Sequence, residues 1–123
     1  MKIAVVGAGA SGILYAILRK KQFPQDEMIL IDKEDRLGKK IYATGNGKCN
    51  LLHEQNDDFI YAYSCIEVAK EVFQKVPLST LLAVFSSLGL DLTQQGDLYY
   101  PRTLSAKTVM DVFNFWLKKL NIQ

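Results

Sequence analysis

The pattern Gly-x-Gly-x-x-Gly at residues 7–12 constrains the fold of this chain more than any other feature, because a strand and a helix are predicted on its two sides. Residues 2–6 form a short apolar run rich in β-branched side chains, which is typical of a parallel-sheet strand buried on both faces. Residues 13–18 repeat apolar side chains at helical spacing, and the cations at 19–21 suit a helix C-terminus. The sequence therefore predicts a glycine turn that joins a strand to a helix.

A second apolar run completes a βαβ unit over residues 1–32. Pro24 marks a turn, and the run at 28–31 repeats the buried-strand pattern and ends at Asp32. We expect a right-handed crossover between two parallel strands. The fold class is therefore α/β, with a Rossmann-like unit at the start of the chain.

This arrangement predicts dinucleotide binding. The first glycine permits the tight turn, the second lets the backbone approach a pyrophosphate, and the third lets helix and strand pack closely. The N–H groups and the positive dipole end at the start of the helix would hold the anion. Asp32 would accept hydrogen bonds from ribose hydroxyls, and its charge disfavours a 2′-phosphate. The alternative is that the glycines serve only the turn and that Asp32 is a solvated strand end.

Composition and charge exclude several other classes of protein. Of the 123 residues, 49% are hydrophobic and 23% charged, so we expect one folded domain rather than disorder. Fifteen Lys and Arg against thirteen Asp and Glu give a net charge of +2, too balanced for a nucleic-acid-binding surface. Two cysteines and one histidine support neither a disulfide framework nor a metal site, and a reducing cytoplasm is expected.

Residues 3–18 carry no charge and lie between Lys2 and the cations at 19–21, as in a signal peptide or a short membrane span. The stretch is shorter than the roughly 18 residues of a spanning helix. Its glycines would also weaken a continuous apolar helix. We therefore expect no membrane insertion, and a cleaved signal is the alternative.

The rest of the chain is predicted to contain a long loop with one short helix, three longer helices and a hairpin. A polar loop at 33–57 contains a short helix at 39–42. Helices follow at 66–76 and 79–88, and then a hairpin of strands at 90–93 and 98–100. Ser79 and Gly89 are expected to cap the second long helix.

A strong amphipathic helix is predicted after Ser105, which would cap it. Its apolar face consists of Val109, Val112, Phe113, Trp116 and Leu120. Residues 121–122 look like the opening of a further strand, because a parallel sheet of two strands should continue. We therefore expect the chain to be a fragment of a longer protein, with helices and the hairpin filling residues 58–123.

A second cluster of candidate binding residues lies in the long loop. No acid occurs between Asp35 and Glu54, whereas four cations do: Arg36, Lys39, Lys40 and Lys48. The glycines among residues 44–50 allow close backbone approach to a ligand, and consecutive N–H groups can form an anion-binding nest. The loop is therefore predicted to hold an anionic ligand, and a solvated loop with ordinary surface lysines is the alternative.

Together these motifs resemble the amino-terminal part of the HI0933-like bacterial flavoproteins, NAD(P)/FAD-dependent oxidoreductases. The resemblance is carried by Gly-Ala-Gly-Ala-Ser-Gly at 7–12, the acid at 32, and especially Gly-Lys-Lys-Ile-x-x-Thr-Gly-Asn-Gly-Lys-Cys-Asn at 38–50. It continues through Phe-Ser-Ser-Leu-Gly-Leu at 85–90 and the segment 100–107, and so covers nearly the whole chain. It implies a Rossmann-like FAD-binding domain of glutathione-reductase type, of which residues 1–123 would be the first part.

The resemblance also implies which residues would contact FAD. The pyrophosphate would meet Gly7, Gly9, Ser11 and Gly12, and the adenosine ribose would meet Asp32, with Lys33 beside it. The flavin side would involve Lys39, Lys40, Thr44, Gly45, Asn46, Gly47, Cys49 and Asn50. Such flavoproteins more often have Glu at the position of Asp32, and Gly and Arg at the positions of Asn46 and Lys48.

Other chemically suggestive side chains are interpreted as structural. We expect Cys49 to be a packing or turn residue rather than a redox thiol beside a flavin. His53 is expected in a surface loop, while Phe113 and Trp116 fit a core-facing stripe with Phe115 beside it. No residue is nominated as a catalytic acid or base.

The resemblance implies that the intact protein is an FAD-dependent oxidoreductase, and we expect the 123 residues alone to be inactive. Its flavin would accept hydride from NAD(P)H and pass electrons to an unidentified small molecule. Two alternatives stay open: an NAD-dependent Rossmann dehydrogenase, which has no need of the basic glycine turn after the second strand, and a non-catalytic nucleotide-binding module or inactive fragment. We expect neither a nucleic-acid nor a membrane partner, and an exposed sheet edge would favour self-association of the chain.

Overall fold

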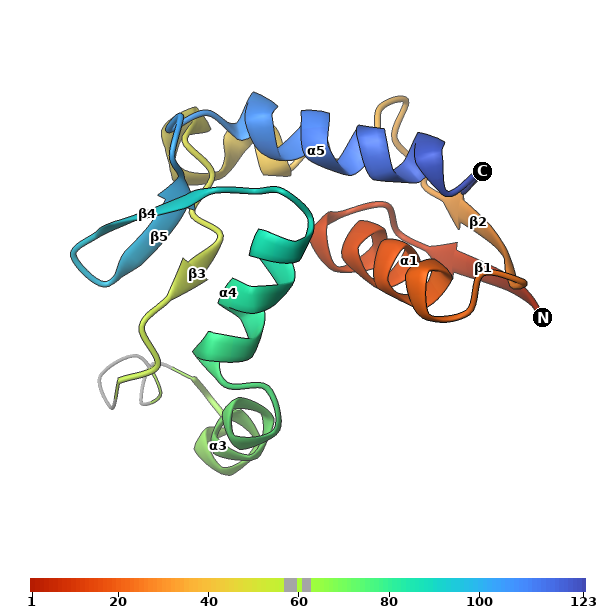
Figure 1. Cartoon of the computed structure of the whole chain (residues 1–123). Helices are drawn as coiled ribbons and strands as arrows, with labels where there is room; N and C mark the ends of the chain where they lie inside the picture. The colour runs from red at the N-terminus through yellow and green to blue at the C-terminus, as the bar shows by residue number, and fades with distance from the viewer. Residues whose placement is uncertain (57–59, 61–62) are drawn as a thin grey trace.

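The computed structural model describes residues 1–56, 60 and 63–123 (Figure 1). Its elements, in chain order, are β1 (Lys2–Val6), α1 (Ala10–Gln22), β2 (Glu27–Ile31), the 3-10 segment η1 (Ile41–Gly47), β3 (Leu52–His53), α3 (Ile66–Lys75), α4 (Leu78–Ser87), β4 (Leu92–Gln95), β5 (Leu98–Pro101) and α5 (Ala106–Lys119). The predicted boundary between the loop at 33–57 and the region at 58–123 lies outside the described residues.

The first three elements form the predicted βαβ unit. β1 and β2 are parallel, and every residue of each strand is paired in register. α1 lies against this pair of strands (Figure 1), and its Ile13, Ala16 and Ile17 side chains are fully buried. The prediction of a strand, a glycine turn, a helix and a parallel strand is therefore confirmed.

Burial of the two strands differs from the prediction, because only one face of the pair is covered. Exposed and less exposed side chains alternate along both β1 and β2. On the open face, Val6 is 84% exposed, Ile29 42% and Ile31 47%. An apolar run indicates that a strand is suited to burial, but it does not supply the element that would cover its second face.

The last residue pairs with the edge of β2 that lies opposite β1. Gln123 N–H donates to the Met28 carbonyl oxygen (3.1 Å), and Leu30 N–H donates to the Gln123 carbonyl oxygen (2.5 Å). Because Gln123 bonds to Met28 and Leu30, the two neighbours of Ile29, these bonds have the pattern of a parallel pair between Gln123 and Ile29. Residues 121–122 still bond back to the last turn of α5. No strand is assigned at 121–123, so of the predicted strand opening only the pairing of Gln123 with β2 is found.

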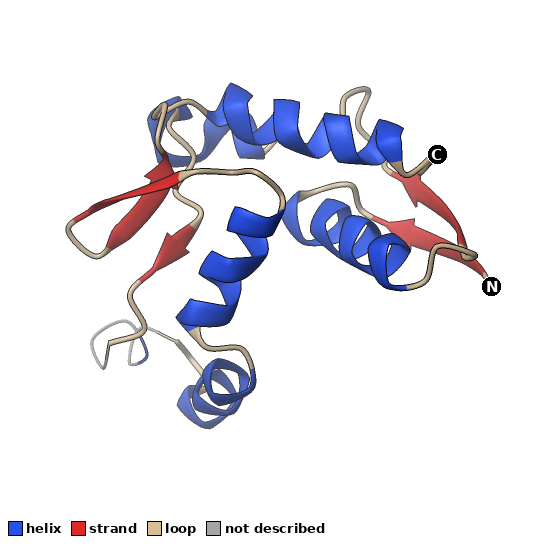
Figure 2. Cartoon of the chain, in the orientation of Figure 1, coloured by secondary structure: helices blue, strands red, loops and turns tan. Residues whose placement is uncertain are grey.

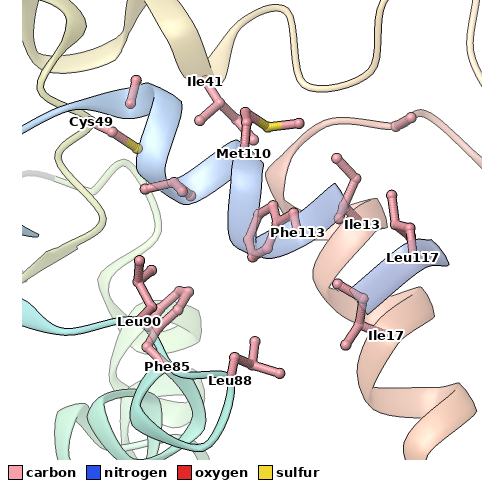
Figure 3. Close-up of a cluster of buried hydrophobic side chains, with 13 residues drawn as sticks. Ile13, Ile17, Ile41, Cys49, Phe85, Leu88, Leu90, Met110, Phe113 and Leu117 are labelled. Carbon is pink, nitrogen blue, oxygen red and sulfur yellow. The ribbon is translucent and has the colours of Figure 1, made fainter. Parts of the chain in front are cut away.

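Helix α5 crosses the molecule and joins the βαβ unit to the remaining elements (Figure 2). Its buried side chains are Ala106, Val109, Met110, Phe113 and Leu117. They pack in one hydrophobic cluster with α1, η1, α4 and Leu90 (Figure 3). Compared with the predicted apolar face, the buried face of α5 is rotated toward Met110 and Leu117, because η1 packs against α5 as well as α1.

The aromatic side chains of α5 divide between core and surface. Phe113 is 1% exposed, as its interpretation as a core residue predicts, whereas Phe115 is 57% exposed. Trp116 is only partly buried, and its indole N–H donates to the Leu88 carbonyl oxygen (2.9 Å). Trp116 therefore links α5 to the end of α4.

A second, antiparallel sheet has the strand order β3-β5-β4. The predicted hairpin is present, but its first strand is Leu92–Gln95 rather than 90–93, so Gln94 and Gln95 pair in the ladder and the turn is limited to 96–97. β3 is not predicted by the sequence, because a strand of two residues shows too little alternation to be recognised. His53 therefore lies in a paired strand and is half-buried, and its expected place in a surface loop is wrong. The short helix expected at 39–42 is found two residues later, as η1.

Helix α3 matches its predicted range closely, whereas α4 begins earlier than predicted. Pro77 is the N-cap residue of α4, in place of Ser79. The Leu78 N–H donates to the side-chain oxygen of Gln55 (3.0 Å), so a residue distant in sequence supplies the cap. At the other end, Gly89 has the predicted capping role in a Schellman motif of two backbone bonds.

Neither cysteine forms a disulfide: Cys49 is buried and Cys65 is exposed. Among the residues that the structure describes, no helix has both the length and the apolar character needed to cross a membrane.

Candidate functional site

The glycine turn between β1 and α1 has the geometry that its spacing predicts. Gly7 has a φ of +100°, which favours glycine, and its N–H donates to the Ile31 carbonyl oxygen (2.7 Å). A Cβ atom at Gly12 would lie 2.0 Å from the Gly7 carbonyl oxygen. The first glycine therefore serves the turn, and the third serves the close contact between helix and strand.

The second glycine and the first turn of α1 face open space. A Cβ atom at Gly9 would have no contact within 4 Å. α1 begins at Ala10, and no side chain caps its N-terminus. The first N–H groups of a helix lack intrahelical acceptors, and the helix dipole places partial positive charge there. Such a position can receive an anion, because a Cβ at Gly9 would meet no atom and the first helical N–H groups lack intrahelical acceptors.

Asp32 follows β2 directly and is bonded to the glycine turn. The Ala8 N–H donates to Asp32 Oδ2 (2.5 Å), and the Glu34 N–H donates to Asp32 Oδ1 (2.9 Å). These backbone hydrogen bonds, that from Glu34 first, hold the pKa of the Asp32 carboxyl below its usual value. Asp32 is thus hydrogen-bonded to the glycine turn as well as lining the cleft, and its contact with a ribose stays a prediction.

A cleft of about 600 Å³ opens between the glycine turn, the end of β2 and the following loop. The predicted site residues that line it are Gly7, Gly9, Asp32, Lys33, Lys39 and Lys40. Lys39 Nζ lies 2.7 Å from Glu34 Oε2, and the Arg36 guanidinium lies 4.1 Å from the centre of the Tyr42 ring. The cleft therefore offers carboxylates at the end of β2 and cations along the loop.

The turn at residues 44–50 folds back on itself. Four of its residues have positive φ values: Gly45, Asn46, Gly47 and Cys49. The Lys48 N–H donates to the Gly45 carbonyl oxygen (3.0 Å), and the Cys49 N–H donates to the Thr44 carbonyl oxygen (3.0 Å). Because these two amides are used within the turn, they are not donors of the anion-binding nest that the glycine content suggested.

A smaller cavity of about 240 Å³ lies against this turn. Its lining combines the predicted site residues Ser11, Thr44, Cys49 and Asn50 with apolar side chains that include Leu14, Ile41, Leu81, Phe85, Val109 and Phe113. Cys49 is 4% exposed, and burial raises the pKa of its thiol. A buried, neutral thiol fits the interpretation of Cys49 as a packing residue.

The predicted site residues are therefore divided between two adjoining places. Gly7, Gly9, Asp32, Lys33, Lys39 and Lys40 line the cleft, and Ser11 lines the cavity with part of the turn at 44–50. The N-terminus of α1 joins the two, since Gly9 lines the cleft and Ser11 lines the cavity. The remaining predicted residues shape the backbone and line neither place: Gly12, Gly45, Asn46 and Gly47.

Gly38 also shapes the site, although the sequence did not mark it as a site residue. Its N–H donates to the Ala8 carbonyl oxygen (2.9 Å), and a Cβ atom there would lie 2.3 Å from Met110 Sδ. Gly38 thereby connects the loop after β2 to the glycine turn through a backbone hydrogen bond. The available signal was its place at the head of the Gly-Lys-Lys string, but spacing alone does not reveal its partner.

Comparison with known proteins agrees with this architecture. The model of the HI0933-like protein Rossmann domain matches residues 1–123. A curated relative, 3-dehydro-bile acid delta(4,6)-reductase of Clostridium scindens, is 33% identical over 122 residues. The alignment covers 99% of this chain but 30% of the relative, so the chain spans less than a third of the length of that reductase. Because the family model matches the whole length of the chain, the chain belongs to the HI0933-like family and carries its Rossmann domain.

Proposed function

We propose that residues 1–123 form the nucleotide-binding part of an FAD-dependent oxidoreductase, with the ADP half of FAD in the larger cleft. The observation that carries this proposal is the uncapped N-terminus of α1, which opens at Gly9 into that cleft. Backbone N–H groups of the first helical turn would receive the diphosphate oxygens. Each charge held there contributes about 0.3–1 kcal/mol, and more where water is excluded.

FAD is favoured over NAD by the second half of the site. The turn at 44–50 and the apolar cavity beside Ser11 adjoin the phosphate-binding turn, where a ring system attached to the diphosphate would extend. We assign the flavin side to the turn residues Thr44, Cys49 and Asn50, which line the cavity, with Gly45, Asn46 and Gly47 shaping the backbone of that turn. Lys39 and Lys40 line the cleft, and we assign them to the flavin side of the diphosphate. Membership of the HI0933-like family supports the same choice.

The chemistry of the reaction would come from the bound FAD, which supplies hydride and electron transfer. The residues of this chain would anchor the diphosphate, recognise the adenosine ribose and place positive charge beside the ring. NAD(P)H as the donor and a small organic molecule as the acceptor complete the proposal, supported by the name of the relative as a reductase.

The test is calorimetric titration of the protein with FAD, NAD and ADP. We expect FAD to bind more tightly than ADP, because it alone reaches the second half of the site, and NAD to bind more weakly than FAD. Tight binding of NAD with none of FAD would favour the dehydrogenase. Binding of none of the three nucleotides would contradict the proposal and favour the inactive fragment.

A matched pair of variants separates specific from general effects of positive charge. Lys40→Gln removes an exposed cation that lines the cleft, and Lys118→Gln removes an exposed cation at the far end of α5. We expect the first to weaken FAD binding a few-fold at low salt, and the second to leave it unchanged. Equal effects of the two substitutions would remove Lys40 from the proposed site.

A further inference from the structure

We infer that the ends of α1 and α5 form a docking surface for an acidic segment of a partner protein. We call this surface the basic patch, and it consists of Lys20, Lys21 and Lys119 with the aromatic side chains of Phe115 and Trp116. α1 and α5 lie against each other and end on the same side of the molecule (Figure 1). The cleft lies at the opposite end of α1, about 20 Å away along a helix of 13 residues, so the inference is independent of the proposed function.

The lysines of the basic patch have no acidic partner in the part of the chain that the structure describes. The two acids that follow α1 are paired with other cations. Asp26 pairs with Arg19 and with the N-terminal ammonium group. Glu27 pairs with Lys2. The positive charge of the patch is therefore available to an anion of another molecule.

Contacts within the patch hold its ammonium groups in place. Lys21 Nζ, from α1, lies 4.2 Å from the centre of the Trp116 ring, and Lys119 Nζ, from α5, lies 4.9 Å from it. Lys20 Nζ donates to two backbone carbonyl oxygens of the turn after α1. Rings and carbonyl oxygens attract an ammonium group without cancelling its charge, and each helix end carries only about half a negative charge. A carboxylate would thus meet cations that are already positioned, which lowers the entropy cost of binding.

The shape of the patch favours a peptide over other polyanions. A hollow of about 400 Å³ lies between the two helix ends, and its lining residues are Lys20, Lys21, Pro24, Lys119, Leu120 and Asn121. Cations around a partly apolar hollow fit one projecting Asp or Glu side chain, with its methylene groups against the apolar lining. A nucleic acid or an anionic membrane instead carries its charges along an extended surface.

An exposed aromatic ring adds an apolar contact beside the hollow. Phe115 is 57% exposed, and Lys119 Nζ lies 5.4 Å from the centre of its ring. Aromatic side chains are the usual anchors of protein interfaces, where they pack against apolar groups of the partner. The expected partner segment therefore combines several Asp or Glu residues with a neighbouring apolar side chain.

The binding experiment uses two fluorescein-labelled peptides, Glu-Glu-Phe-Glu-Glu and Gln-Gln-Phe-Gln-Gln, titrated with the protein and followed by fluorescence anisotropy. We expect the acidic peptide to bind about tenfold more tightly than the uncharged one at low salt, and the difference to shrink at about 0.5 M salt, where exposed charges are screened. Absence of binding by the acidic peptide, or equal affinity for the two peptides, would overturn the inference.

Two double variants of equal net charge locate the binding surface. Lys21→Gln with Lys119→Gln removes two cations of the patch, and Lys75→Gln with Lys107→Gln removes two exposed cations on α3 and at the start of α5. We expect the first pair to weaken binding of the acidic peptide about tenfold and the second to change it by less than about twofold. Denaturation midpoints check that both variants are folded. Equal losses of affinity would mean general attraction by net charge and would overturn the inference.

Competition distinguishes a protein partner from other anions. Phosphatidylglycerol vesicles or poly(U) RNA that bind the wild type more tightly than the acidic peptide, and lose affinity in the Lys21→Gln, Lys119→Gln variant, would overturn the assignment to a protein. Saturation with FAD should leave the peptide affinity unchanged, because α1 separates the two places. Failure of FAD to bind would contradict the proposed function and leave the peptide result standing.

Discussion

The two glycine-rich turns of this chain, at residues 7–12 and 44–50, use the same residue type for opposite purposes. In the first turn, the Ala8 peptide groups hydrogen-bond to the Asp32 carboxylate and to the Gly38 N–H, and the open side of Gly9 faces a cleft. In the second, the amides of Lys48 and Cys49 bond within the turn. Glycine content thus indicates only where a backbone can bend sharply, whereas the direction of its N–H groups decides whether it can bind an anion.

The largest expected effect comes from Gly12→Ala, in the first turn. The added Cβ would lie 2.0 Å from the Gly7 carbonyl oxygen, so helix and strand must separate. We expect the free energy of unfolding to fall by about 3 kcal/mol or more, measured by chemical denaturation. Gly9→Ala is the matched control and should change stability little, because its Cβ meets no atom within 4 Å. Equal destabilisation by the two would contradict the different tasks assigned to these glycines.

The next effect concerns ligand binding rather than stability. Gly9→Val fills the space assigned to the diphosphate, so we expect at least a 100-fold loss of ADP affinity, equivalent to about 2.7 kcal/mol. The free energy of unfolding should change by only about 1 kcal/mol, because the substitution affects an N-cap position. Calorimetry measures the first quantity and denaturation the second. Retained ADP affinity in a folded Gly9→Val protein would remove the phosphate assignment.

A smaller effect is expected from Gly45→Ala, in the second turn. Gly45 has a φ of +56°, and a Cβ there would lie 3.0 Å from the Asn50 backbone nitrogen. We expect destabilisation by about 1–2 kcal/mol from backbone strain, with unchanged affinity for ADP. A parallel titration with FAD would show a loss if this turn contacts the ring. Loss of ADP affinity as large as in Gly9→Val would mean that the two turns share one phosphate site.

The smallest expected effect is a change in how stability depends on acid pH when Asp32, which is bonded to the first turn, is replaced. Backbone hydrogen bonds lower the pKa of Asp32 from its usual value of 3.8, so its stabilising contribution is complete above that pH and is lost as the pH falls through the lowered value. Asp32→Asn should therefore flatten the loss of stability below about pH 4. Denaturation midpoints at a series of pH values measure this. Identical acid profiles of the wild type and the variant would mean that the Asp32 bonds contribute nothing to stability.

The sequence predicted the βαβ unit because local patterns define each of its parts. Strand, turn and helix have distinct periodicities, and the spacing of the three glycines corresponds to three separate steric requirements. The open space at Gly9 and the clash at Gly12 agree with the roles expected from spacing alone.

Features that depend on distant partners were not predictable in this way. The start of α4 is capped by Gln55, so the local signal of Ser79 was misleading. The buried face of α5 is set by the direction in which η1 approaches, which no pattern within the helix encodes. Similarly, Asp32 was recognised as the acid at a strand end, but its bond to Ala8 depends on how the turn folds over β2.

Trp116 gives the chain a built-in spectroscopic reporter. It is the single tryptophan, and its indole N–H bonds to the end of α4 while Lys21 and Lys119 lie 4.2 Å and 4.9 Å from its ring centre. Its emission wavelength should therefore follow the docking of α5 onto α4 and α1, and it should shift to the red when those helices separate. Fluorescence can thus follow the integrity of the hydrophobic cluster in each variant while calorimetry follows the nucleotide.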